Sequence, residues 1–362
     1  MDKNVITLNR NESNAIKGLL IFLIVLGHNA VFTKSIPSSF EYLYTFHVQT
    51  FFILPFLYGT KSKSLIDSFS KNFVRLYYPF LLFFTLLSIL WLFAQGRIAD
   101  ANSVSDLDLS YSGKVLYFIS AIFTGNYFLI DYFSGFQFLW FLPVMFSMNI
   151  LRETLEERKY VQRIILIIGI ASYIMFFVFM YKKPYADDVN FRLMLFSPFA
   201  ILQGCGAYFM GKMCVDIMRN KHNKVTIPLL SILFIIASII YIVIACSGFL
   251  TNEILWFLRF IMPFLFINFL YSIKERLAVS KILKNLGIYS FPIYIIHPVL
   301  CTVVFMICQR LSCVSVVSSL VVQAVVVIVS YYTSILLFKI TPLRKRIFPR
   351  SWDEVCLNSF QK

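Results

Sequence analysis

Apolar stretches follow one another along almost the whole chain and are separated by short polar segments. Most of them run for about 20 residues, the length that a helix needs to cross the hydrocarbon core of a bilayer. The pattern therefore predicts an all-α, polytopic integral membrane protein. Ten transmembrane helices are predicted, at residues 14–33, 41–60, 72–95, 136–152, 161–181, 191–212, 225–247, 252–272, 287–309 and 314–340.

One further apolar stretch, from Gly113 to Asp131, differs from these ten. It is rich in aromatic residues, but Ser, Thr, Gly and Asn interrupt it. We therefore expect an interfacial or re-entrant element rather than an eleventh span. A spanning helix at this position would reverse the orientation of every helix that follows.

The distribution of Lys and Arg decides between the two topologies, because cytoplasmic loops are enriched in these residues. With ten helices and a cytoplasmic N-terminus, the inner segments hold 24 of the 33 basic residues and the outer segments hold seven. Lys17 and Arg259 lie within helices. An eleventh span would move the four later basic loops to the outer side. The charges therefore predict ten spans with both termini in the cytoplasm.

The composition agrees with a membrane protein. Of the 362 residues, 59% are hydrophobic and 14% are charged, whereas soluble domains have about 45–50% and about 25%. Basic cytoplasmic loops account for the net charge of +15, so no nucleic-acid partner is predicted. The seven cysteines lie mostly in or beside apolar runs, without the spacing of a zinc or redox site. Cys308 and Cys313 are the one plausible disulfide.

The chain is expected to form one membrane domain, residues 1–342, without an internal repeat. No removable signal peptide is expected at the N-terminus, so the first helix would remain as a signal anchor. Residues 343–362 are basic and amphipathic. They predict a cytoplasmic tail that lies along the inner leaflet of the membrane.

Two polar residues stand out in the first apolar stretch, where both are costly in hydrocarbon. Lys17 and His28 are eleven residues apart, which places them within about 20° of one helix face and roughly 16 Å apart along the axis. A structural interpretation is open: Lys17 extends to the interface and His28 makes an interhelical hydrogen bond. In the alternative interpretation, this face carries the chemistry of the protein.

Two more histidines, His47 and His297, also fall within predicted helices. No intramembrane Asp, Glu or Cys offers a natural further metal ligand, so no metal is predicted. A neutral imidazole suits general-base chemistry on a hydroxyl. In that hypothesis His28 is the base, Lys17 holds the phosphates of a cytoplasmic thioester donor, and Arg75 is a second phosphate contact. Arg75 is equally explained as a positive-inside anchor.

Two other residues allow both a structural and a binding role. Arg259 lies about two turns into its helix, where it can extend to the outer surface or bind a sugar or an anionic group. Trp140 fits an interfacial aromatic belt first and a substrate platform second.

Several short sequences occur together in one order along the chain. They are Lys17-Gly18 and, after ten intervening residues from Lys17, His28; Phe46-His47 before Phe51-Phe52; Arg75 with Pro79; Leu139 to Leu142; and Ser290 to His297. This set resembles acyltransferase family 3 of integral membrane O-acyltransferases, especially its polysaccharide and fucose O-acetylase-like branch. The resemblance implies a ten-helix fold and acyl transfer from a coenzyme A thioester, with His28 catalytic and Lys17 and Arg75 near the donor.

The chain departs from the family pattern at three places. The acidic residue that usually precedes the basic residue by three positions is Asn14 here, and the first arginine of a paired motif is Asn72. The Ser-Gly turn common after the Phe-Phe pair is Leu54-Pro55. The two asparagines bear on how the donor is bound.

The resulting prediction is a multi-pass enzyme of the cell inner (cytoplasmic) membrane. It transfers an acetyl group from acetyl-CoA to a hydroxyl of a surface or lipid-linked glycan, with membrane lipid around it. Succinyl transfer is an alternative. A glycan transporter or flippase is another, although no internal repeat or intramembrane carboxylate supports it. The residues expected to contact the acceptor are His47, Trp140, Arg259, Ser290 and His297.

Overall fold

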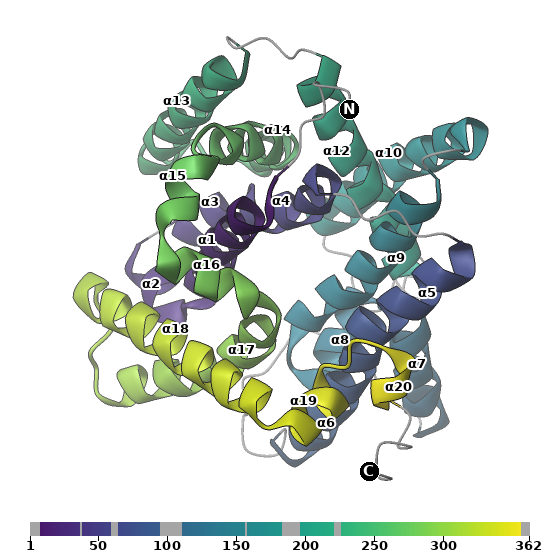
Figure 1. Cartoon of the computed structure of the whole chain (residues 1–362). Coiled ribbons are helices and arrows are strands. Elements are labelled where there is room, and N and C mark those ends of the chain that lie inside the picture. Colours follow the sequence, from purple (N-terminus) through teal and green to yellow (C-terminus); the bar gives the residue numbers. More distant parts are fainter. Residues whose placement is uncertain are drawn as a thin grey trace. The chain divides into compact units, whose positions relative to one another are not determined.

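The structure, a computed structural model, describes residues 8–36, 38–58, 64–94, 111–155, 158–182, 196–220 and 226–355. Parts of the predicted span at 191–212 and of the predicted tail lie outside these residues. Every regular element in the described part of the chain is a helix (Figure 1). Contacts divide the chain into two compact units, which are Met1–Gly59 with Gly211–Thr341 and Thr60–Met210 with Pro342–Lys362.

Five helices among the described residues are long and apolar enough to cross a membrane. The all-helical membrane fold is therefore confirmed, whereas the count of ten spans and the cytoplasmic termini stay predictions. The five candidate spans are Leu65–Phe93, Ile227–Cys246, Asn252–Ser272, Ser290–Arg310 and Val316–Lys339.

The first unit is built around α1 (Arg10–His28), which packs against α4 and α15 to α18 (Figure 1). The crossing with α16 is unusually close, because a Cβ atom on Gly18 would lie 1.9 Å from the carbonyl oxygen of Leu283. The other helices of this unit are α2 (Ala30–Ser35), α3 (Ser39–Tyr44), α4 (His47–Ile53), η1 (Leu54–Leu57), α13 (Thr226–Cys246), α14 (Asn252–Ser272), α15 (Lys274–Val279), α16 (Lys281–Ile288), α17 (Ser290–Arg310) and α18 (Val316–Lys339).

Two predicted helices of this unit are interrupted in the structure. The helix predicted at 14–33 ends at His28, because the side chain of Asn29 accepts a hydrogen bond from the backbone N–H of Phe32 and so caps α2. The helix predicted at 41–60 is divided into α3, α4 and η1, with a turn at Thr45 and Phe46. The hydrophobicity of the sequence predicted neither of these two helix breaks.

The second unit begins with a nearly continuous helical stretch that contains a π-helical turn. This stretch begins at Leu65, seven residues before the span predicted at 72–95, and α12 ends at Asn220, eight residues beyond the span predicted at 191–212. The boundaries of the other predicted spans agree within about three residues. The helices of this unit are α5 (Leu65–Asn72), η2 (Phe73–Tyr77), α6 (Tyr78–Ala94), α7 (Tyr111–Thr124), α8 (Tyr127–Ser134), η3 (Gln137–Trp140), α9 (Phe141–Thr154), α10 (Lys159–Lys182), α19 (Thr341–Ile347) and α20 (Trp352–Val355), while α12 (Phe199–Asn220) continues into the first unit.

The stretch from Gly113 to Asp131 contains two helices, α7 and α8, rather than one. Gly125 separates them in a left-handed conformation with φ of 60°, which glycine adopts without steric cost. The 14 residues of α7 rise roughly 21 Å, less than the ~30 Å of a hydrocarbon core. The described part of α7 is therefore shorter than the hydrocarbon core is thick.

Candidate active site

His28 is the last residue of α1, at the point where Asn29 ends the helix. The Asn29 side chain is buried, and its amide also donates a hydrogen bond to the carbonyl oxygen of Ser319 in α18 at 3.0 Å. This contact fixes the end of α1 against α18. The His28 imidazole is consequently held at a defined place rather than on a fraying helix end.

Two aromatic side chains contact the His28 ring. The Tyr44 hydroxyl is 3.3 Å from His28 Nε2, within hydrogen-bond distance. The rings of His28 and His297 are 5.2 Å apart between centroids and tilted by 58°. The structure therefore brings two of the predicted histidines together, from helices α1 and α17, and adds Tyr44 from α3.

His47 occupies the first position of α4 and is fully buried. Its Nδ1 donates a hydrogen bond to the carbonyl oxygen of Leu43. A carbonyl oxygen can only accept, so Nδ1 carries a proton and the neutral ring presents a lone pair at Nε2. No described residue makes a hydrogen bond to this buried Nε2.

His47 is joined to the His28 site through α1 and Tyr44. Its Nε2 would lie 3.5 Å from a Cβ atom placed on Gly27, the neighbour of His28, so a glycine here lets His47 approach α1 closely. The Tyr44 and His47 rings meet edge to face at 4.7 Å. Tyr44 thus contacts both His28 and His47.

His297 is held in the same way as His47. It is fully buried, and its Nδ1 donates to the carbonyl oxygen of Ile293 at 3.0 Å. The ring of Tyr294 lies 5.9 Å away. In both histidines the bond to the carbonyl four residues earlier assigns the proton to Nδ1 and leaves Nε2 as a potential acceptor. The three imidazoles, which we call the histidine centre, can together accept and orient hydroxyl protons.

Lys17 lies on the same continuous helix as His28, nearer its N-terminus. The side chain is half-buried, and its ammonium group lies 4.5 Å from the centre of the Tyr58 ring. A cation–π contact of this kind holds the charge without neutralising it. Asn14, one turn earlier, lies at the close crossing with α16, where a Cβ atom on Gly287 would be 1.8 Å from its carbonyl oxygen.

Arg75 belongs to the second unit, where it is exposed on the π-helical turn η2. Its Nε donates to the carbonyl oxygen of Arg350 at 3.5 Å. The nearby Asn72 has a structural partner, because its amide donates to the buried carboxylate of Glu153 at 3.2 Å. Ser68, Lys71 and Arg152 also bond to that carboxylate, so Asn72 is one part of a buried network around Glu153.

The other predicted substrate residues lie elsewhere in their units. Trp140 ends η3 in the second unit and is half-buried, with Tyr127 6.3 Å from its ring. Arg259 in α14 is half-buried and interacts electrostatically with Tyr241. Ser290 begins α17, seven residues and roughly 10 Å of helix rise before His297.

No group of three His, Cys, Asp or Glu residues in the described ranges is placed to hold a metal ion. Sequence reasoning identified all three histidines of the centre and missed Tyr44. The signal for Tyr44 was present, because it precedes His47 by three residues in the same polar sequence. Its distance from His28 depends on the turn at Thr45 and Phe46, which the hydrophobic pattern did not contain.

The fold and the site together define a helical membrane protein with a histidine centre suited to acid–base chemistry. A family model described as an acyltransferase domain, acyltransferase family 3, matches residues 10–339. The chain belongs to this family and is a membrane acyltransferase, as the resemblance in its sequence predicts. No curated protein and no solved structure matches the chain.

Proposed function

We propose that the protein is an O-acetyltransferase of the polysaccharide and fucose O-acetylase-like branch, with acetyl-CoA as donor and a hydroxyl of a surface or lipid-linked glycan as acceptor. The observation that carries the proposal is the contact between His28 Nε2 and the Tyr44 hydroxyl at 3.3 Å. In the proposed tautomer, His28 Nε2–H donates to the Tyr44 oxygen, so this contact orients the ring and leaves the lone pair of Nδ1 to take the proton of the acceptor hydroxyl, as general-base catalysis requires.

In the proposed reaction, His28 takes the proton of the acceptor hydroxyl, and the hydroxyl oxygen attacks the carbonyl carbon of the thioester. A C–O bond forms and the C–S bond breaks. The coenzyme A thiolate leaves and takes up a proton, which His28 can return. The products are the acetyl ester and free coenzyme A.

His47 and His297 are positioning residues in this proposal. Their rings are fixed through Nδ1, and Nε2 of each can accept a hydrogen bond from the acceptor sugar. Trp140, Arg259 and Ser290 are proposed as further sugar contacts, Trp140 as a stacking platform and Arg259 as a hydrogen-bond donor.

Lys17 is the proposed contact for the donor phosphates, with Arg75 as a second one. The donor arm would extend along α1 for the roughly 16 Å that separate Lys17 from His28. We place Lys17 on the cytoplasmic side of the cell inner (cytoplasmic) membrane, with ten spans and both termini in the cytoplasm, because of the Lys and Arg distribution.

The experiment is transfer of radiolabelled acetyl groups from acetyl-CoA in membranes that carry the wild type, His28→Ala or Lys17→Ala. Loss of the base lowers the rate about 10²- to 10⁴-fold, and Lys17→Ala raises KM for acetyl-CoA. Lys281→Ala, at an exposed lysine at the start of α16, is the matched control and retains wild-type kinetics.

Succinyl-CoA, tested in parallel, distinguishes the two acyl groups. Wild-type rates in correctly inserted His28→Ala protein would refute the catalytic role of His28. Absence of coenzyme A binding to the purified wild type would instead favour a glycan transporter or flippase. Membership of an acyltransferase family argues against that alternative.

A further inference from the structure

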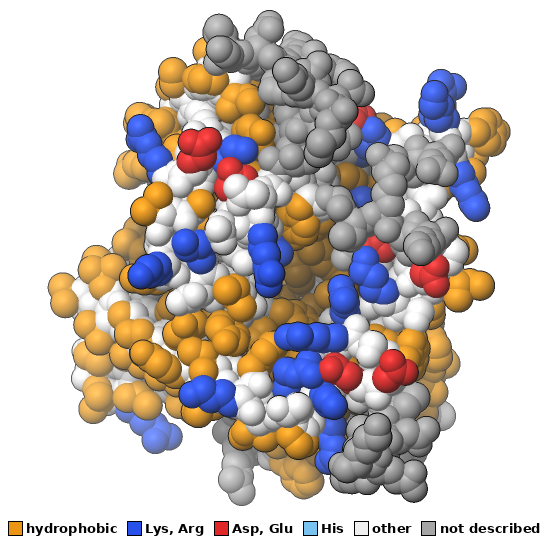
Figure 2. Space-filling view, viewed as in Figure 1, with side chains coloured by type: hydrophobic (Ala, Val, Ile, Leu, Met, Phe, Trp, Pro, Cys, Tyr) orange, Lys and Arg blue, Asp and Glu red, His pale blue; other side chains and the backbone are white. Residues whose placement is uncertain are grey.

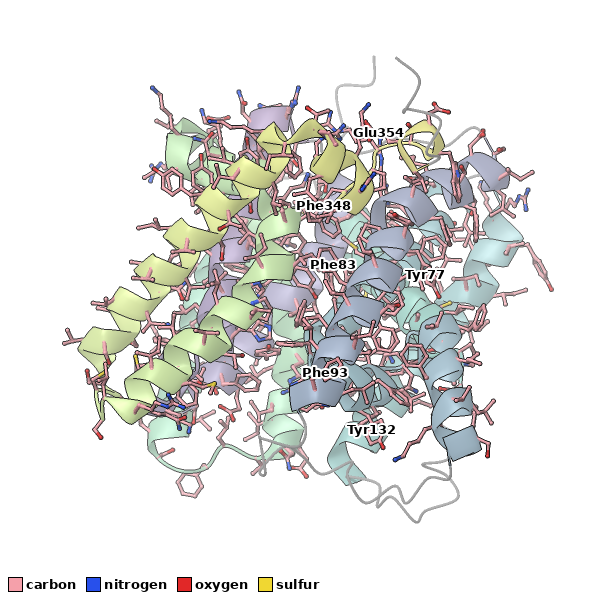
Figure 3. The ribbon with its side chains drawn as sticks, turned by 90° about the horizontal axis from the view of Figure 1, so that it is seen from below. Tyr77, Phe83, Phe93, Tyr132, Phe348 and Glu354 are labelled. Carbon is pink, nitrogen blue, oxygen red and sulfur yellow. The ribbon has the colours of Figure 1, made fainter. Side chains whose placement is uncertain are left out.

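The segment that follows the family domain packs onto the second unit. The family model ends at residue 339, and α19 and α20 come after it. Phe348, between these two helices, is buried with its ring 6.0 Å from that of Phe83 in α6, and Figure 3 labels the two side by side. The aromatic side chain of Phe348 therefore packs against the protein and does not face the inner leaflet.

Trp352 makes the second contact of this segment. Its indole N–H donates to the hydroxyl of Ser70 in α5. Its ring stacks on that of Phe73 in the π-helical turn, with centroids 5.5 Å apart and planes 13° apart. The side chain nevertheless remains 43% exposed, so part of the indole surface is open to a flat ligand.

Two arginines flank these aromatic contacts: Arg75 lies two residues after Phe73, and Arg350 lies two residues before Trp352. Arg75 and Arg350 adjoin through the bond from Arg75 Nε to the Arg350 carbonyl oxygen, and both side chains are exposed. Neither guanidinium group forms an ion pair with a carboxylate in the part of the chain that the structure describes.

Glu354, two residues after Trp352, is an acidic group of the same segment and already has partners. Burial alone would raise its pKa, but hydrogen bonds from Arg344 at 2.6 Å and from the backbone N–H of Arg350 at 2.7 Å, together with the positive charges of these two arginines, lower it below its usual value. Glu354 therefore stays ionised and paired with Arg344. Figure 2 shows Lys and Arg side chains gathered over α19 and the residues after it.

We propose that Arg75, Arg350 and Trp352 form a binding site for a phosphorylated adenine nucleotide, the end of the coenzyme A donor that carries the 3′-phosphate. Exposed guanidinium groups bind phosphate oxygens in a bidentate manner, and a stacked indole with an open face binds a purine ring. The inference rests on the proposed function in taking a coenzyme A thioester as donor. It assigns part of donor recognition to a segment outside the family domain.

Arg350→Ala tests this site cleanly, because it removes the guanidinium group and keeps the backbone atoms that bond to Arg75 and Glu354. The assay compares KM for acetyl-CoA with KM for acetyl-pantetheine, which lacks the nucleotide. We expect about a tenfold rise in KM for acetyl-CoA and no rise for acetyl-pantetheine, since a charge-assisted hydrogen bond is of this size.

Trp352→Leu is expected to act in the same direction, and Trp352→Phe to restore most of the affinity by keeping the stack. Arg163→Ala, at an exposed arginine of α10 in the same unit, is the matched control and leaves both KM values unchanged. Adenosine 3′,5′-bisphosphate should compete with acetyl-CoA in the wild type about tenfold better than in Arg350→Ala.

Equal changes for both donors in Arg350→Ala would show a structural role and overturn the site. A lower KM for acetyl-CoA would show that the segment covers Arg75 instead of completing a site. Weaker binding to phosphatidylglycerol vesicles with unchanged KM values would assign the same phosphate chemistry to lipid headgroups. Each of these results leaves the proposed function standing, because that proposal fails on a different result: no transfer of acetyl groups from acetyl-CoA by the wild type.

Discussion

Tyr44 provides the most direct test of how the histidine centre works. Tyr44→Phe removes the hydroxyl that lies 3.3 Å from His28 Nε2 and keeps the ring that packs against His47. The hydroxyl orients the imidazole, whereas the imidazole itself moves the proton. The two variants Tyr44→Phe and His28→Ala should therefore differ greatly in their effect on the rate.

The magnitude follows from the geometry. One half-buried hydrogen bond contributes about 0.5–1.5 kcal/mol, and 1.36 kcal/mol corresponds to a tenfold change in rate. Tyr44→Phe should thus lower kcat about two- to tenfold. His28→Ala removes the general base and should lower it by about 10²–10⁴. Because the tyrosine acts through His28, the double variant should be no slower than His28→Ala alone.

The assay is single-turnover acetyl transfer with purified protein in nanodiscs. Tyr42→Phe is the control, since it removes a hydroxyl on the same short helix, α3, that bonds to Ser238 at 2.8 Å. It should retain the wild-type rate. An unchanged rate in Tyr44→Phe would refute the orienting role. A loss as large as that of His28→Ala would show that the tyrosine itself takes part in the chemistry.

Two packing predictions concern stability, measured by thermal unfolding in detergent. Gly18→Ala would place a Cβ atom 1.9 Å from the Leu283 carbonyl oxygen, so α16 must move by about 1.5 Å to reach ordinary contact. We expect the free energy of unfolding to fall by about 1–3 kcal/mol. Gly206→Ala, whose nearest contact would be 3.6 Å away, is the control and should leave stability unchanged. Glu153→Gln removes a buried charge that accepts bonds from two cations, and we expect about 2 kcal/mol of destabilisation, with Asp67→Asn on the exposed face of α5 as a neutral control. Equal stability of variant and control in either pair would contradict the reasoning.

Asn72 shows how a departure from a family pattern can be compensated by packing. From the sequence, asparagine in place of arginine bears on donor binding. In the structure its amide donates to Glu153 at 3.2 Å and to the Ser68 carbonyl oxygen at 2.8 Å. The residue is buried within a network that joins α5 to α9. Its partner lies about 80 positions away, so no local pattern could have revealed this role.

The sequence by itself determined the helical membrane class and the family, and it showed which polar residues lie within apolar runs. Runs of about 20 apolar residues admit few other structures, because backbone polar groups in hydrocarbon must be satisfied within a helix. For the same reason a histidine in such a run is conspicuous, and His28, His47 and His297 were all identified from it.

The tertiary structure decided which of these residues meet. The break at Asn29 and the turn before His47 depend on capping and on contacts with α18, neither of which changes the hydrophobicity of the chain. These breaks place Tyr44 against His28. Gly18 and Gly287 allow α1 and α16 to cross closely, and α17, which follows α16, carries His297 to the His28 ring. Hydrophobicity reports how long a helix can be, whereas side-chain contacts between distant segments determine where it ends and what it faces.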